Sequence, residues 1–188
     1  MNPIIKISLC ILMFLCSGCV LISAPKDDAP FAEVKGIHSL EGCYQNKGEG
    51  ESENPSRYLS SIIWPESKLN HNEITLIKVV AINDKKLKVT AESQGKIIQE
   101  SQFVEGKDFN VNTKEIRAKS EPLISLAYPA GNVFIGVAYS SQVLGIDERG
   151  DAKLQETGTF AGTAFIVIPL AGHVKDSFRF RRVEEVCK

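Results

Sequence analysis

The sequence predicts a mostly β protein, an antiparallel meander of about eight strands with one short helix near residues 55–64. Two observations support this prediction. Apolar and polar residues alternate over short segments that turn residues separate, and no long amphipathic helical pattern interrupts them. Strands without helical crossovers are joined by hairpins, so the sheet should be antiparallel. Because the edges of such a sheet must be hidden, we expect a coiled sheet or a small barrel with a mostly filled interior.

The strand signals differ in clarity along the chain. Residues 85–92 are the clearest, because Leu87, Val89 and Ala91 alternate with lysine, threonine and glutamate. The longest signal, over 152–169, has glycines on its apolar face, which is typical of a bend or a close backbone approach. A turn at Ala171–Gly172 should follow it. The predicted strands are 40–46, 73–82, 85–92, 97–104, 109–118, 123–127, 132–146, 152–169 and 177–183.

The helix signal precedes most of the strands. Asn54 suits the N-cap and Pro55 suits the first helical position. Four apolar residues then fall on one helical face, which should pack on the core. These residues are Tyr58, Leu59, Ile62 and Ile63.

The N-terminus carries a charged start, a short apolar run and a small-residue site before a cysteine: Lys6, Ile7–Phe14 and Ser17–Gly18–Cys19. This resembles the signal sequence of bacterial lipoproteins, in which the chain is cut before a cysteine that receives diacylglycerol. The resemblance implies a signal peptide over 1–18, lipid on Cys19 and attachment to a membrane of the cell envelope. Because Val20, and not Asp, follows the cysteine, it implies the outer membrane. The stretch 7–22 is shorter than the ~20 residues of a spanning helix.

The remaining residues suggest a lipidated tether over 19–39 and a single β-rich domain over 40–188. Prolines and charges break any period in the tether. The net charge of −1 gives no indication of nucleic-acid binding. Besides Cys19, the exported chain keeps Cys43 and Cys187, which should form a disulfide in an oxidising compartment. The three histidines lack metal-ligand spacing, so we expect neither a metal nor a cofactor.

Two resemblances concern the β-rich part. Gly42–Cys43–Tyr44 resembles the Gly-x-Trp opening of lipocalins, and Arg179 or Arg181 resembles the arginine that packs over it. A longer stretch is similar to small β-rich lipoproteins of Gram-negative bacteria, and it implies fold and location but no activity. That stretch comprises Leu40, Gly42, Tyr44, Asn46 and the segment 58–65.

The sequence contains no catalytic motif, so we expect no catalytic residues and a non-enzymatic interaction or accessory module with an envelope protein partner. One alternative is a lipocalin-like carrier of a small apolar ligand, which needs a cavity of ~300 Å³ or more. A second alternative is a serine hydrolase that uses Ser60–Ser61 or Ser140–Ser141 with His71 or His173 as base. A contact between a serine and a histidine would support that alternative.

Overall fold

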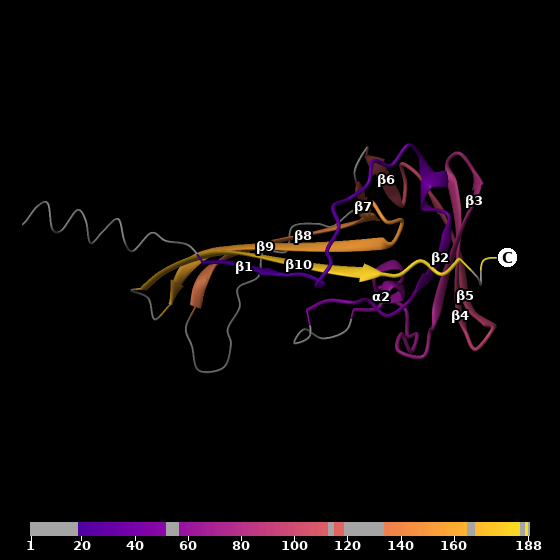
Figure 1. Ribbon diagram of the computed structural model, residues 1–188. Coiled ribbons are helices and arrows are strands. Elements are labelled where there is room, and N and C mark those ends of the chain that lie inside the picture. Colours follow the sequence, from indigo (N-terminus) through magenta and orange to yellow (C-terminus); the bar gives the residue numbers. More distant parts are fainter. Residues whose placement is uncertain are drawn as a thin grey trace, which may run out of the picture. The chain divides into compact units, whose positions relative to one another are not determined.

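The computed structural model describes residues 19–51, 57–112, 115–118, 134–164, 168–184 and 187. Within them the protein is mostly β, as predicted, with one α-helix (Figure 1). The predicted signal peptide 1–18 and the predicted strand 123–127 lie outside the described residues. The elements are β1 (Cys19–Ser23), η1 (Ile37–Leu40), β2 (Gly42–Gln45), α2 (Leu59–Ile63), β3 (Leu76–Asn83), β4 (Lys86–Ser93), β5 (Lys96–Val104), β6 (Phe109–Asn112), β7 (Glu115–Ala118), β8 (Phe134–Ile146), β9 (Ala152–Ala164) and β10 (Ile168–Phe180).

The strands form two sheets, one of six strands in the order β1-β10-β9-β8-β7-β6 and one of four in the order β2-β3-β4-β5. Neither sheet closes into a barrel. The chain also divides into two compact units. Unit 1 comprises residues 1–22, 121–141 and 157–175, and unit 2 comprises residues 23–120, 142–156 and 176–188. Strands β8, β9 and β10 contribute residues to both units.

The four-stranded sheet belongs to unit 2 and follows the predicted alternation. Val79 on β3 pairs with Val89 on β4, and Ile77 pairs with Tyr44 on one side and Ala91 on the other. These inward positions are buried or half-buried, whereas the opposite face of the two strands carries Lys78, Lys88 and Glu92. Since one face must be buried, the register follows from the hydrophobic pattern. This is why the strands β3, β4 and β5 lie close to their predicted bounds.

Helix α2 begins later than predicted and receives its cap from another element. Asn54 lies outside the described residues, and the residue that precedes the helix is Tyr58 in an extended conformation. Asn46, just after β2, accepts hydrogen bonds at the helix N-terminus. Its carbonyl oxygen accepts from the amide of Leu59 and its Oδ1 from the amide of Ser60, each at 2.8 Å. The first backbone amides of the helix, which have no partner within the helix, therefore donate to a residue in another segment of the same chain.

The predicted strand 152–169 is two strands. β9 ends at Ala164 and β10 begins at Ile168, so the expected turn at Ala171–Gly172 falls inside β10. In unit 1 a Cβ on Gly172 would overlap the Phe160 ring. The absence of a side chain at Gly172 thus leaves room for the Phe160 ring, a close approach of the kind that a glycine within a strand allows. Similarly, the predicted strand 109–118 is the hairpin of β6 and β7.

The region expected to be a free tether differs from that prediction. Residues 19–23 form strand β1, and the stretch that follows packs on unit 2 with Val34 and Ile37 buried. Lys153 fixes it: its Nζ donates to the carbonyl oxygen of Ala29 at 2.6 Å and pairs with Asp28 Oδ1 at 2.6 Å. The prolines that hide any period do not prevent packing, because an irregular segment can be held by contacts with distant strands.

The predicted disulfide between Cys43 and Cys187 is present, with 5.7 Å between the two Cα atoms. The chain after β10 runs antiparallel to β2, where Gln45 N donates to Arg181 O and Val183 N donates to Cys43 O. Arg182 forms an isolated antiparallel β-bridge with Tyr44, whereas the side chains of Arg179 and Arg181, named for the lipocalin resemblance, both pair with Glu49. The two ends of the β-rich region are thus neighbours although no barrel closes.

Candidate binding cavity beneath the helix

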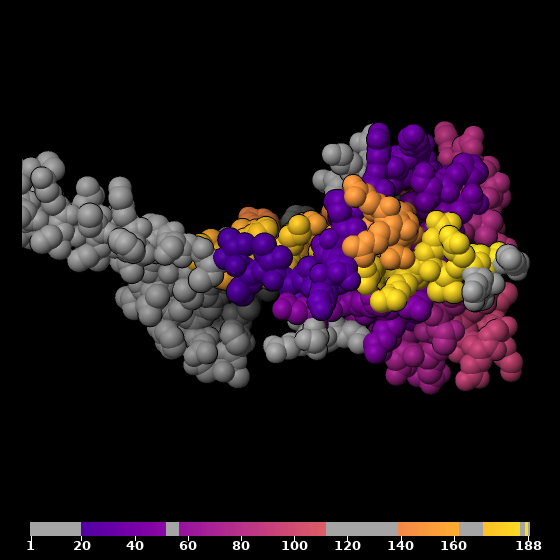
Figure 2. Space-filling model, in the orientation of Figure 1, coloured from indigo at the N-terminus to yellow at the C-terminus, as the bar shows by residue number. Residues whose placement is uncertain are grey.

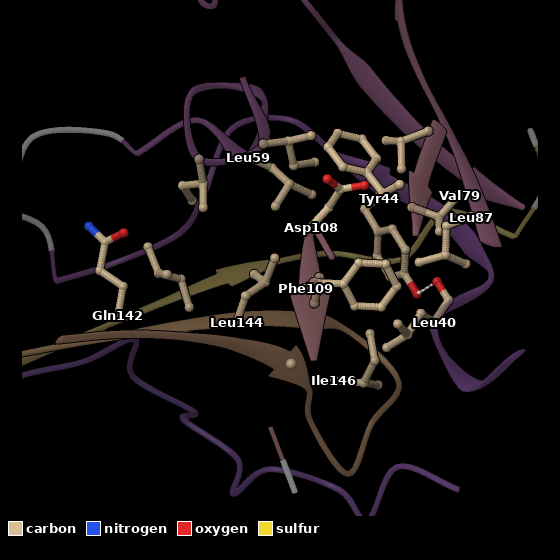
Figure 3. Close-up of a pocket in the computed structure, with 17 residues that line it drawn as sticks. Leu40, Tyr44, Leu59, Val79, Leu87, Asp108, Phe109, Gln142, Leu144 and Ile146 are labelled. Atoms are coloured by element: carbon tan, nitrogen blue, oxygen red, sulfur yellow. Dashed lines mark hydrogen bonds between the residues drawn. The ribbon is translucent and has the colours of Figure 1, made fainter. Parts of the chain in front are cut away.

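An apolar cavity of about 180 Å³ lies in unit 2 (Figure 3). Helix α2 contributes Leu59, Ile62 and Ile63 to its wall, because these positions share the helical face that turns toward the sheets. The other wall residues come from strands of both sheets. Among them are Val79, Leu87, Val89, Phe109, Leu144 and Ile146.

Most polar groups of this cavity already have hydrogen-bond partners within the chain. The Tyr44 hydroxyl donates to the carbonyl oxygen of Leu40 at 3.0 Å, as Figure 3 shows. Burial raises the pKa of Tyr44 to about 12, so this wall is uncharged at neutral pH. Asp108 and Gln142 are exposed and mark the side that opens to solvent. Asp108 Oδ2 accepts from Val104 N, and the Gln142 amide donates to Glu156.

The volume limits what this cavity can hold. A pocket for a drug-sized ligand measures ~300 Å³ or more, whereas a dry apolar cavity of ~150 Å³ is large enough for benzene. At about 180 Å³, the cavity matches one ring or one branched aliphatic group. Its apolar wall offers dispersion contacts and exclusion of water, and these favour an apolar group without charge.

Next to the helix, Asn46, Ser60 and His71 form a buried polar cluster. Asn46 and Ser60 are fully buried. The Asn46 amide nitrogen donates to the carbonyl oxygens of His71 at 2.7 Å and Ile74 at 3.0 Å. Ser60 Oγ lies 2.9 Å from His71 Nδ1. Sequence reasoning named Asn46 only within the stretch that is similar to small β-rich lipoproteins, and it did not predict these buried hydrogen bonds.

The Ser60–His71 contact is the one that a hydrolase would require, so its geometry matters. Ser60 has no exposed surface, and a substrate carbonyl therefore has no route to Oγ in this conformation. Catalytic serines also need a base that a third group orients. Among the side chains described, no carboxylate bonds to His71. The arrangement instead ties the loop after α2 to the helix.

The other serine and histidine candidates are not brought together. Ser61 Oγ donates to the carbonyl oxygen of Tyr58. In unit 1, Ser141 Oγ lies 2.5 Å from Thr157 Oγ1, and His173 Nδ1 lies 3.0 Å from Thr159 Oγ1.

A charged cluster holds the last strand to the segment after β2. Glu49 accepts from the guanidinium of Arg179 at 2.6 Å and lies 2.6 Å from Arg181 Nε. Burial would raise the pKa of Glu49, but the hydrogen bonds from the two arginines outweigh it and the pKa is lowered. Arg179 is itself buried and raised in pKa by the same bond. The two guanidinium groups share the Glu49 carboxylate, and Asp151 Oδ2 lies 4.0 Å from Arg179 Nε, so the charges of the cluster are paired within the fold.

Comparison with known protein families, curated proteins and solved structures found no match. Among the described residues, no helix has the length and apolar character to cross a membrane. Cys19 begins β1, but its side chain lies outside the description.

Proposed function

We propose that the chain is a lipid-anchored protein of the bacterial cell envelope, attached to the outer membrane through Cys19. Its β-rich part is a non-enzymatic interaction module. In this proposal the cavity beneath α2 accepts one apolar side chain of an envelope protein partner.

The observation that carries the proposal is the size and chemistry of the cavity. Binding energy in protein interfaces concentrates in a few anchors that fill well-packed pockets. A cavity of about 180 Å³ suits such an anchor and is small for a carried ligand. The exposed rim residues Asp108 and Gln142 supply the polar border that interfaces place around an apolar centre.

The lipid anchor is tested by metabolic labelling with a radioactive fatty acid. Wild type should incorporate label, Cys19→Ala should not, and Cys16→Ala is the matched control that keeps it. Equal labelling of wild type and Cys19→Ala would contradict the anchor.

The module is tested by placing a photo-crosslinking residue at Gln142 in intact cells and identifying the products by mass spectrometry. Ile63→Trp should fill the cavity and abolish the crosslink to a specific protein. Ile98→Trp, at an exposed position of β5, should leave it unchanged. A crosslink that survives Ile63→Trp would show that the cavity takes no part.

A further inference from the structure

Strand β1 exposes three consecutive apolar side chains directly after Cys19. Val20 and Leu21 are each 63% exposed and Ile22 is 67% exposed. In the space-filling view, the indigo N-terminal residues are open on the face shown (Figure 2). Exposed apolar residues that occur singly need no explanation, but a contiguous set at the end of a sheet does.

The exposure covers both faces of the strand. Successive side chains on a strand point to opposite sides, so Leu21 faces away from Val20 and Ile22. All three are exposed to a similar degree, so neither face of β1 is buried at residues 20–22. A docking protein would cover one face of an edge strand. A lipid environment surrounds both.

The chain leaves little distance between Cys19 and the folded protein. The first buried residue after it is Pro25, and Ala29 is held by Lys153. At ~3.3 Å per residue, the stretch from Cys19 to Pro25 reaches no more than about 20 Å. A lipid on Cys19 therefore brings β1 to the membrane surface.

The depth to which β1 can enter the bilayer is limited by its backbone and by the charged residues that follow it. Among the described strands, β1 is the outermost of its sheet, so one of its backbone edges has no described strand beside it. Unpaired amides and carbonyls are costly in hydrocarbon and tolerable among headgroups. Charged residues begin at Lys26, which limits the apolar stretch. The same unit exposes Tyr139, a residue type that favours the membrane interface.

We propose that β1 lies at the headgroup–acyl boundary of the bilayer and that Val20, Leu21 and Ile22 contact lipid there. This inference rests on the proposed lipid at Cys19. In this proposal the lipid on Cys19 is the first membrane contact and β1 is the second. Together they set the orientation of unit 1 relative to the bilayer. The partner is the lipid surface itself.

The test uses the lipidated full-length protein, purified and reconstituted into vesicles of phosphatidylethanolamine and phosphatidylglycerol that contain lipids brominated near the headgroup. Leu21→Trp reports on β1, and Ile97→Trp, on an equally exposed residue of β5 in unit 2, is the matched control. The native Trp64 is buried and gives the background. Formation of the Cys43–Cys187 disulfide checks that each variant folds.

The bromolipids should reduce the emission of Leu21→Trp, and aqueous iodide should have little effect on it. Ile97→Trp should show the reverse. Leu21→Trp emission that only iodide quenches, or equal bromolipid quenching of both variants, would overturn the inference. Because fatty-acid labelling of the same preparations is measured separately, loss of the lipid anchor is distinguished from an anchored protein whose β1 stays in water.

Discussion

At the scale of single residues, the Asn46 side chain joins the end of β2 to helix α2 and to the loop before β3. It is fully buried, its amide donates to two carbonyl oxygens and its Oδ1 accepts from the Ser60 amide. Such a group is valuable because removing it leaves buried partners unsatisfied.

We therefore expect Asn46→Ala to lower the free energy of unfolding by about 3 kcal/mol. Several buried groups lose their hydrogen-bond partner in this variant, and each such loss costs about 1–3 kcal/mol. Urea unfolding followed by circular dichroism measures this. The exposed Asn72 provides the control Asn72→Ala, which should lose less than about 0.5 kcal/mol. Equal losses would show that Asn46 has no special role.

Tyr44 gives a pH prediction. Its pKa is raised to about 12 by burial, from 10.0 in the unfolded chain. A raised pKa means that the contribution to stability is complete below pH 10 and is lost as the pH rises through 12. Wild type should thus lose stability over this alkaline window, and Tyr44→Phe should lose less of it. Thermal unfolding at a series of pH values would show parallel curves for both proteins if the inference is wrong.

At the scale of elements, the charged cluster of Glu49, Arg179 and Arg181 predicts acid sensitivity. The arginines lower the pKa of Glu49, so its contribution is present above the ordinary value of 4.5 and is lost as the pH falls through the lowered value. Glu49→Gln should destabilise the protein at neutral pH and flatten its stability curve below pH 4.5. The exposed Glu66 offers the control Glu66→Gln. An unchanged acid limb in Glu49→Gln would contradict this prediction.

The elements also show what the sequence could predict. Strands such as β4 were predictable because Leu87 and Val89 must face the core. When one face of a strand is buried, the alternation of apolar and polar residues determines its register. The start of α2 was not, since its cap comes from Asn46 and not from a local residue. The packing of 25–37 was also missed, because it depends on Lys153, more than a hundred positions along the chain. Local pattern carries no record of a distant partner.

At the scale of the whole molecule, the disulfide was predictable because only Cys43 and Cys187 remain in the chain after the proposed lipid site at Cys19. The cavity was not. The predicted filled interior came from apolar inward faces, and such faces fill a core or line a cavity equally well. The distance between the packed elements decides whether a filled core or a cavity forms. No local sequence pattern indicates that distance.

The cavity gives a prediction for the intact protein. Organic extraction of the purified protein followed by lipid mass spectrometry should find no apolar compound in stoichiometric amount, since a lipid bonded covalently to Cys19 would stay with the protein. The reason is that a volume of about 180 Å³ is below the ~300 Å³ of a ligand pocket. The cavity-filling variant Ile63→Trp is the control for any compound that is recovered. A stoichiometric ligand that disappears in this variant would favour the carrier alternative.

The bond between Cys43 and Cys187, 144 positions apart, turns the part of the protein between them into a covalent ring, and the N-terminal segment with the proposed lipid site at Cys19 extends from it. A protease that cuts once anywhere inside the ring releases nothing, because the disulfide holds both pieces together; if Cys19 carries the proposed lipid, both pieces also stay on the membrane. We expect a protein nicked in the 52–56 segment to run as one species on a non-reducing gel and as two after reduction. A single proteolytic cut would therefore open this ring without releasing either piece.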